Sequence, residues 1–145
     1  MSEKQRINGH CLCGAITIRV ASANTSLGAC HCVMCRRWVG GPYLAMDCGT
    51  EVSFDGEQSI GVYDSSDWAE RGFCKQCGSN LFYRLKENQQ YMMPPGLFEP
   101  IANIEFDHQV FIEEKPGYYE FANKTHNMTG EECFAAFSQD KNSDE

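Results

Sequence analysis

The sequence predicts a small, mainly β domain of antiparallel sheets with a short C-terminal helix. Brief apolar runs, rich in β-branched and aromatic residues, recur at regular intervals between Gly and Pro residues. Helical periodicity is scarce, so βαβ units with a parallel sheet are not expected. The 145 residues suffice for a single domain with its own hydrophobic core.

The strands are placed by the alternation of apolar and polar residues. Residues 15–20, Ala-Ile-Thr-Ile-Arg-Val, alternate with period two, which predicts a half-buried strand. Shorter runs of the same kind predict seven further strands, at residues 42–46, 52–54, 60–63, 80–84, 90–93, 102–106 and 109–112.

Two short helices are expected. Residues 32–38 follow a cysteine cluster and have room for one or two turns. Thr129-Gly-Glu-Glu132 matches a capping box, and the mostly apolar residues 133–137 continue it as a helix. The polar and charged residues 138–145 predict a disordered acidic tail. The domain is therefore placed at residues 1–137.

Charge and hydropathy exclude several classes of protein. The net charge of −8 argues against a nucleic-acid partner, because such proteins usually carry a clustered basic face. An apolar run of about 18 residues, the length that spans a membrane, does not occur. The first ten residues are polar and do not resemble a signal peptide, so we expect a cytoplasmic location. Nothing in the sequence indicates the oligomeric state.

The cysteines are the strongest signal in the chain. There are nine, an odd number that fits a disulfide framework poorly, and most are clustered. In a reducing compartment such clusters indicate metal binding. They are Cys11, Cys13, Cys30, Cys32, Cys35, Cys48, Cys74, Cys77 and Cys133.

Two cysteine knuckles share one pattern. Cys11-Leu-Cys13-Gly14 and Cys74-Lys-Gln-Cys77-Gly78 each lead into a predicted strand. A glycine in this place lets the chain turn at positive φ, so that both thiolates face one ion. Four thiolates make a closed, structural zinc site. From spacing alone, Cys11 and Cys13 could instead pair with Cys30 and Cys32.

The remaining cluster is Cys30-His-Cys-Val-Met-Cys35, with three thiolates in six residues. Three protein ligands and an open fourth position are typical of catalytic zinc. The spacing leaves a second possibility, a closed site completed by His31, Cys48 or Cys133.

Four segments, in order, resemble one known family. They are Gly9-His-Cys-Leu-Cys-Gly-Ala-Ile16, Cys30-His-Cys-Val-Met-Cys-Arg36, Arg71-Gly-Phe-Cys-Lys-Gln-Cys-Gly-Ser79 and Leu81-Phe-Tyr83. The chain is similar to the glutathione-dependent formaldehyde-activating enzymes, which include centromere-protein-V-like proteins. The resemblance covers about residues 9–120. It departs from the family at the turn over residues 96–100, which is bulkier and less acidic here.

The resemblance implies two zinc ions per chain. Cys11, Cys13, Cys74 and Cys77 would hold a structural ion, and Cys30, Cys32 and Cys35 a catalytic one. It also implies a mostly β fold shared with a small zinc-binding Rab exchange factor. The implied reaction joins glutathione and formaldehyde and is classed as a carbon–sulfur lyase.

Glutathione carries two carboxylates, so an acidic protein needs local cations to bind it. Arg36 and Arg37 follow the three-cysteine cluster and Arg71 precedes the second knuckle, and Arg suits bidentate carboxylate contacts. Trp38 and Phe98 are further candidates to line the pocket. Each of these residues could equally serve surface ion pairs or the core.

Two other functions are open to a chain with these cysteines. A binding module with two structural zinc ions would expose a large apolar patch to a protein partner. A thiol redox or metal-buffering protein would cycle its three-cysteine cluster between thiolates and a disulfide, with Arg36 and Arg37 favouring the thiolates.

Overall fold

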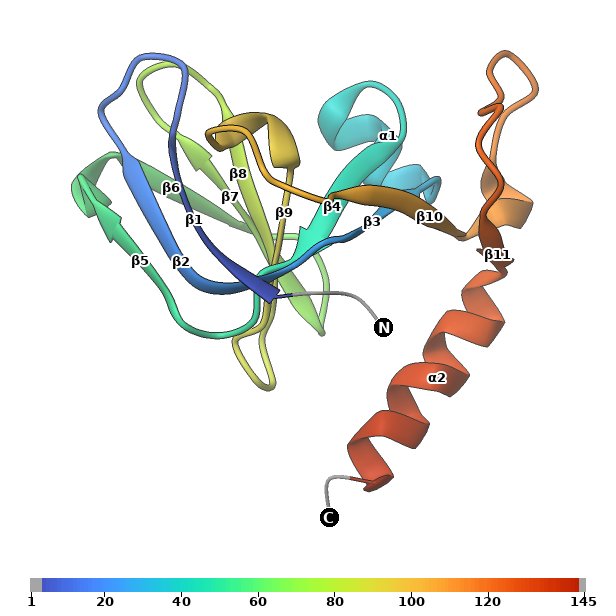
Figure 1. Cartoon of the computed structure of the whole chain (residues 1–145). Helices are drawn as coiled ribbons and strands as arrows, with labels where there is room; N and C mark the ends of the chain where they lie inside the picture. The colour runs from blue at the N-terminus through green and yellow to red at the C-terminus, as the bar shows by residue number, and fades with distance from the viewer. Residues whose placement is uncertain (1–3, 144–145) are drawn as a thin grey trace. The chain divides into compact units, whose positions relative to one another are not determined.

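The computed structural model describes residues 4–143, and the side chains of residues 4–136. Within these residues the backbone forms eleven strands and two α-helices, which confirms the mainly β prediction (Figure 1). The strands are β1 (Lys4–His10), β2 (Thr17–Asn24), β3 (Ser26–Cys30), β4 (Tyr43–Asp47), β5 (Val52–Asp55), β6 (Ile60–Asp64), β7 (Ala69–Cys74), β8 (Asn80–Leu85), β9 (Tyr91–Met93), β10 (Glu105–Val110) and β11 (His126–Met128). The helices are α1 (Val33–Val39) and α2 (Gly130–Ser143).

The chain folds as two compact units, each made of two segments that are distant in sequence. The first unit comprises the residues up to 27 and residues 45–105, and the second comprises residues 28–44 and those from 106 onward. The chain passes from one unit to the other inside β3, inside β4 and after the first residue of β10.

The first unit contains two antiparallel layers. β1, β2 and β5 form a three-stranded sheet, side by side in Figure 1, and β4, β9, β8, β7 and β6 follow one another in a second sheet. Buried side chains from both sheets form one core, which includes Ile7, Ile18 and Phe82. The Phe82 ring packs edge-on against Tyr91, with ring centroids 5.0 Å apart. The core as a whole holds together β1, β2 and β8, which flank the two knuckles.

The sequence analysis missed four strands, β1, β3, β7 and β11. β1 is polar, but every second residue of its latter half faces inward, and Ile7 is buried there. β7 contains Arg71 and Gly72, which are unusual in the interior of a sheet. Gly72 is required because a Cβ at this position would lie 2.2 Å from Cζ of Phe82. Tertiary packing therefore overrides weak local preference in these strands.

Two predictions about the later strands were wrong. The runs at residues 102–106 and 109–112 contribute to one strand, β10, because Asp107 and His108 between them continue the strand. β10 and β11 pair in parallel, with Val110 opposite Met128, although only antiparallel pairing was expected. The long connection between them, residues 111–125, allows this direction.

The second unit has the strand order β11, β10, β3, β4 and carries both helices. Two adjacent glutamates bind the first turns of these helices. The Glu114 carboxylate accepts the N–H of Val33 in α1 at 3.0 Å, and the Glu113 carboxylate accepts the N–H of Gly130 in α2 at 3.0 Å. The segment after β10 thus fixes where both helices begin.

The predicted capping box is confirmed at the start of α2. Thr129 N–H donates to the Glu132 carboxylate at 2.9 Å, and Glu132 N–H donates to Oγ1 of Thr129 at 3.1 Å. The helix, however, runs to Ser143, beyond the predicted end at residue 137 and into the segment expected to be disordered. Residues 138–143 contain neither Gly nor Pro, so no local stop signal ends it. The last two residues of the predicted tail, 144–145, lie outside the described residues.

None of the helices in the described part of the chain combines the length and apolar character needed to cross a membrane.

Candidate metal centres and active site

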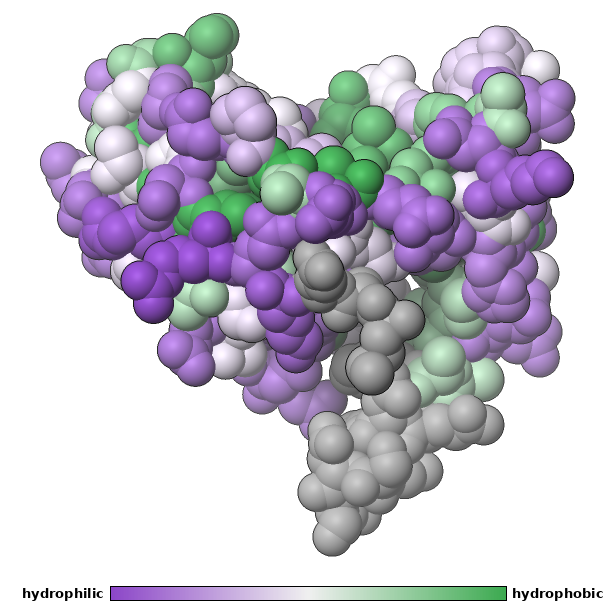
Figure 2. All heavy atoms as spheres, viewed as in Figure 1, coloured by the Kyte–Doolittle hydropathy of each residue, from purple (hydrophilic) through white to green (hydrophobic). Residues whose placement is uncertain are grey.

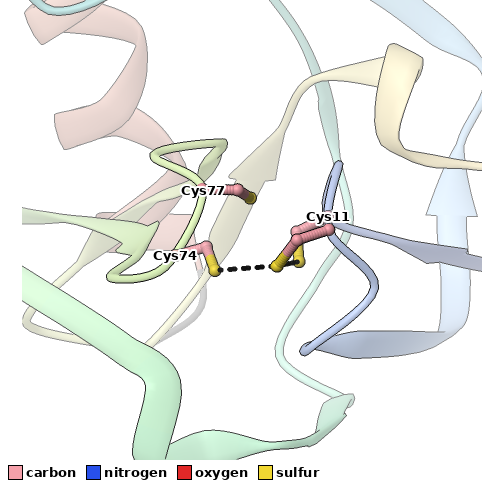
Figure 3. A group of neighbouring side chains, drawn as sticks. Cys11, Cys74 and Cys77 are labelled. Atoms are coloured by element: carbon pink, nitrogen blue, oxygen red, sulfur yellow. Dashed lines mark hydrogen bonds between the residues drawn. The ribbon is translucent and has the colours of Figure 1, made fainter.

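The first cysteine cluster lies in the first unit, where two turns meet. Cys11 and Cys13 belong to the turn between β1 and β2, and Cys74 and Cys77 to the turn between β7 and β8. The side chains of Cys11, Cys74 and Cys77 point toward one another from these two turns (Figure 3). The structure brings these four predicted ligands together, because all four sulfur atoms lie within 4.8 Å of one another.

The two turns have the same backbone geometry. The N–H of Gly14 donates to the carbonyl of Cys11 at 3.1 Å, and that of Gly78 donates to the carbonyl of Cys74 at 2.8 Å. Both glycines have φ of 80°, a left-handed conformation that side chains rarely adopt. The expected role of the glycines in the knuckles is therefore confirmed.

The sulfur positions fit a tetrahedral zinc ion. Sulfurs bound at 2.3 Å in a tetrahedron lie about 3.8 Å from one another. The sulfurs of Cys11 and Cys13 are 3.7 Å apart, and those of Cys13 and Cys74 are 3.8 Å apart. These separations are far too long for disulfides, whose S–S bond is about 2.05 Å. The four thiols are spaced as ligands of one ion.

The electrostatics of this cluster also favour a bound cation. The Ser79 hydroxyl and backbone N–H groups lower the pKa of Cys77 to about 5. The N–H of Ala15 lowers the pKa of Cys13, but partial desolvation and the three neighbouring thiols together outweigh it and raise this pKa to about 11. Without a cation only some of four adjacent thiols can ionise together, whereas bound zinc deprotonates every ligand.

One side of the first cluster faces solvent. Cys11 and Cys74 are fully buried and belong to the core of the first unit, whereas Cys13 is exposed. Leu12 is 84% exposed, and apolar surface is visible over the β1–β2 turn at the upper left of Figure 2. The cluster therefore joins the core at its inner side, as a structural site would.

The second cluster lies in the second unit, at the start of α1. Cys30 is the last residue of β3, Cys32 is the N-cap of α1, and Cys35 lies in the first turn. Sγ of Cys32 accepts the N–H of Cys35 at 3.3 Å. The three sulfurs lie within 4.8 Å of one another. The strand end and the helix turn thus bring them together locally.

The structure decides the alternatives that spacing left open. Among the described residues, the second group of potential ligands contains only the three cysteines. Cys48 is buried in the first unit, where burial raises its pKa to about 12, and Cys133 lies in α2. Neither belongs to a group of ligands, and free cysteines of this kind pack as small apolar residues. A set of three thiolates fits a catalytic metal, which usually has three protein ligands.

His31 lies between two of these cysteines in sequence but is bonded elsewhere. Its ring is fully buried and stacks on Tyr119, with centroids 5.5 Å apart. Nε2 lies 2.7 Å from Oε1 of Gln109, and Nδ1 lies 2.7 Å from the Tyr119 hydroxyl. An amide oxygen only accepts, so Nε2 carries the proton and Nδ1 accepts from Tyr119. His31 orients the loop between ligands rather than binding the ion.

The hydrogen bonds continue beyond Gln109. Its amide nitrogen donates to Oγ1 of Thr125 at 2.9 Å, and this hydroxyl donates to Oδ1 of Asn127 at 2.6 Å. A series of hydrogen bonds, each donated in the same direction, therefore runs from Tyr119 through His31 to Asn127 in β11. Burial lowers the pKa of His31, and the positive charges of Lys115 and Arg36 lower it further. A neutral imidazole is what this chain of donors and acceptors requires.

The close packing of the three thiols also opposes ionisation in the second cluster. Contact with Cys32 and Cys35 raises the pKa of Cys30, and burial adds to the effect. A cation would remove this penalty by binding the thiolates directly. The residues present therefore fit a metal ion here as well.

The residues predicted to bind substrate lie in different places. In the second unit, Nε of Arg36 donates to the carbonyl of His31 at 2.9 Å, Arg37 is exposed on α1, and the Trp38 ring packs near Tyr43. In the first unit, Arg71 is only 3% exposed and lies over the Tyr83 ring, and Phe98 packs against the core.

The sequence analysis assigned no role at the site to Gln109, Tyr119, Thr125 or Asn127. These residues lie about 80 to 95 positions from the cysteine cluster, and no motif links them to it. The only usable signal was His31 itself, since a buried histidine between two ligands needs hydrogen-bond partners.

Comparisons with known proteins agree with the geometry. The model of the glutathione-dependent formaldehyde-activating enzyme family matches residues 6–114. An uncharacterized lyase of Schizosaccharomyces pombe is 41% identical over 125 residues, covering 86% of this chain and 91% of that protein. A Halomonas elongata protein named for the same family is 25% identical over 148 residues, covering 90% of this chain and 88% of its own length.

One solved structure supports the fold. The crystal structure of a Rhodobacter sphaeroides protein superposes with a TM-score of 0.56 at 24% identity, covering 66% of this chain and 91% of that protein. The family model extends over both cysteine clusters and well over half of the chain. The chain therefore belongs to the glutathione-dependent formaldehyde-activating enzyme family.

Proposed function

We propose that this protein is a zinc-dependent carbon–sulfur lyase that interconverts glutathione plus formaldehyde with S-hydroxymethylglutathione. The observation that carries the proposal is the three-cysteine cluster, which offers three thiolates and no fourth protein ligand among the described residues. Family membership and the lyase named among its relatives support the same class of reaction. They favour the enzyme over a binding module or a redox protein.

The chemistry needs an activated thiol next to an aldehyde. In the forward direction the sulfur of glutathione forms a bond to the carbon of formaldehyde, the C=O π bond opens, and the thiol proton ends on the new hydroxyl oxygen. Zinc held by Cys30, Cys32 and Cys35 would supply Lewis acidity, which favours a thiolate or a polarised carbonyl. Cys11, Cys13, Cys74 and Cys77 would hold a second, structural ion.

The residues around the cluster would keep its geometry fixed. The N–H of Cys35 donates to Sγ of Cys32, and the Glu114 carboxylate fixes the first turn of α1 at Val33. The buried ring of His31 fixes the backbone between Cys30 and Cys32. Because the site is already organised, binding energy can be used to bring the two reactants together.

Arginines near the cluster are our candidates for substrate carboxylates. Arg36 is tied to the carbonyl of His31, and Arg37 is exposed one residue further along α1. Trp38 follows on the same helix. We place the activity in the cytoplasm, because thiolate clusters persist where thiols are kept reduced.

The first test is the metal content. Untagged protein purified without chelator should contain about two zinc ions per chain by elemental mass spectrometry, as two separate thiolate clusters predict. About one ion per chain would mean that the three-cysteine cluster does not hold zinc, and the redox or binding functions would then be favoured.

The second test is turnover. The zinc-loaded protein should accelerate the formation of S-hydroxymethylglutathione, followed by NMR, and Cys35→Ser should reduce the rate to background. Cys133→Ser, a change outside both clusters, is the matched control and should keep the activity. A folded Cys35→Ser variant with the wild-type rate would refute the proposal.

A further inference from the structure

The second unit contains a cavity that the sequence did not reveal. Its volume is about 350 Å³, within the range of roughly 300–1,000 Å³ that is usual for small-molecule sites. Residues of β10, β11 and the connection between them line it, and this connection is the orange loop next to β11 in Figure 1. All of the lining residues belong to the second unit, as the second cysteine cluster does.

The charges in the cavity wall differ from those of the whole protein. Lys115 and Lys124 contribute two positive charges and Glu120 one negative charge, whereas the chain as a whole carries −8. Nζ of Lys115 donates to the carbonyls of Pro116 and Tyr119, at 3.1 and 2.6 Å. These bonds fix the ammonium group and use two of its three donors. The cavity is therefore a place where an anion is favoured locally.

The rest of the wall is suited to a peptide. Amide side chains of Asn123 and Asn127 and the hydroxyl of Thr125 can bond to amide groups, and Phe121 and Ile112 supply apolar surface. Two cations, one anion and several amides match a small peptide that carries two carboxylates, one ammonium group and internal amide bonds.

The cavity wall is also joined to the second cysteine cluster. Gln109 lines the cavity, and its Oε1 accepts from Nε2 of His31, the residue between Cys30 and Cys32. Phe121, another wall residue, lies 6.2 Å from the His31 ring between centroids. A molecule in the cavity thus contacts groups that pack directly on the segment carrying the three thiols.

We propose that this cavity binds the peptide portion of the thiol substrate, with its carboxylates at Lys115 and Lys124 and its ammonium group at Glu120. The identity of the peptide as glutathione rests on the proposed function above. This inference replaces the arginines of α1, named above as candidates for the substrate carboxylates, with the two lysines of the β10–β11 connection.

The test uses zinc-loaded protein and S-methylglutathione, whose blocked sulfur leaves the peptide portion as the source of binding. Isothermal titration calorimetry should show binding to the wild type. Lys124→Gln and the isosteric Asn123→Asp should each weaken it about tenfold or more, because one removes a cation and the other adds an anion beside the carboxylates. Lys4→Gln, at an exposed lysine of β1, is the matched control and should bind like the wild type.

Two outcomes would overturn the inference: no binding of S-methylglutathione to the wild type, or unchanged affinity in both cavity variants. The result is separable from the proposed function. If the peptide binds in the cavity but glutathione and formaldehyde do not react, the inference stands and the function fails. If turnover occurs with the same KM for glutathione in Lys124→Gln, Asn123→Asp and the wild type, the function stands and the inference fails.

Discussion

The two cysteine clusters of this protein assemble the same ligand atom in different ways. In the first unit, four sulfurs come from turns 61 positions apart, and two of the cysteines belong to the core. In the second unit, three sulfurs come from six consecutive residues, next to a hydrogen-bonded chain of polar side chains. The first cluster joins distant strands, whereas the second is assembled by one strand end and one helix turn.

This difference separates stability from reactivity. An ion bound by the first cluster closes a long loop and so stabilises the fold, since the unfolded chain loses much more freedom when distant residues are joined. An ion bound by the second cluster would close almost no loop, and three protein ligands would leave a fourth position for another ligand. Under the proposed function, the same element would be structural in one unit and catalytic in the other.

Removing one ligand from each cluster should give the largest contrast. Cys74→Ser should prevent folding of the first unit, because structural zinc sites contribute on the order of 10 kcal/mol to folding in zinc-finger peptides. Cys35→Ser should lose one zinc ion per chain but keep the circular dichroism of a folded β protein. Metal analysis and thermal unfolding would measure both effects.

Cys133→Ala provides the background for this pair, since Cys133 is half-buried and belongs to neither cluster. Equal losses of stability in Cys74→Ser and Cys35→Ser would show that the two clusters do not differ in the way described.

Breaking the series of hydrogen bonds that runs from His31 through Gln109 to Thr125 should have a smaller effect. Gln109 is 5% exposed and bonds both His31 and Thr125. Gln109→Leu leaves these partners buried without their bonds, and we expect a loss of about 1–3 kcal/mol in the free energy of unfolding. The second zinc ion should also be released more readily to a competing chelator, while the first is retained.

Gln58→Leu, an exposed position in the first unit, should change neither property. If Gln109→Leu released both zinc ions equally, the hydrogen bonds of Gln109 would not support the second cluster in particular.

The smallest effect is expected from removing the ion pair between Arg19 of β2 and Asp55 of β5. Arg19 and Thr17 hydrogen-bond the Asp55 carboxylate and lower its pKa below its usual value of 3.8. A lowered pKa stabilises the fold above pH 3.8, and this contribution is lost only as the pH falls through the folded value. Asp55→Asn should therefore lower Tm by a small amount, about 1–2 °C, since the pair is exposed.

Thermal unfolding between pH 7 and pH 5 tests this prediction. The difference between wild type and Asp55→Asn should stay constant in this range and vanish in about 1 M salt. Any fall in the stability of both proteins would come from protonation of the thiolates and release of zinc. A difference that already shrinks above pH 5 would contradict the assignment.

Local patterns were sufficient for much of the fold. Period-two alternation identified the strand that became β2, and the capping box identified the start of α2. β1 and β7 could not be found, because their polar residues and Gly72 are explained only by the strands and rings packed against them. The parallel pair of β10 and β11 depends on how residues 111–125 return, which no local signal specifies.

Metal sites were easier to predict than the binding surface. The local sequence determines the turn of each knuckle, since Gly14 and Gly78 permit the positive φ that brings two sulfurs together. Substrate anchors have no such internal rule, and an arginine next to a cysteine motif can equally be buried, as Arg71 is. The sequence did not indicate a role for the cavity lysines, because no motif links them to the segment that contains His31.

By itself the sequence determined the family and the cysteine motifs that could bind metal, because motif spacing is a short-range property of the chain. Only the tertiary structure decided that Cys11 and Cys13 join Cys74 and Cys77, that His31 faces Gln109, and that a charged cavity lies behind it. These are contacts between segments distant in sequence. They are set by the packing of strands, which local residue patterns do not encode.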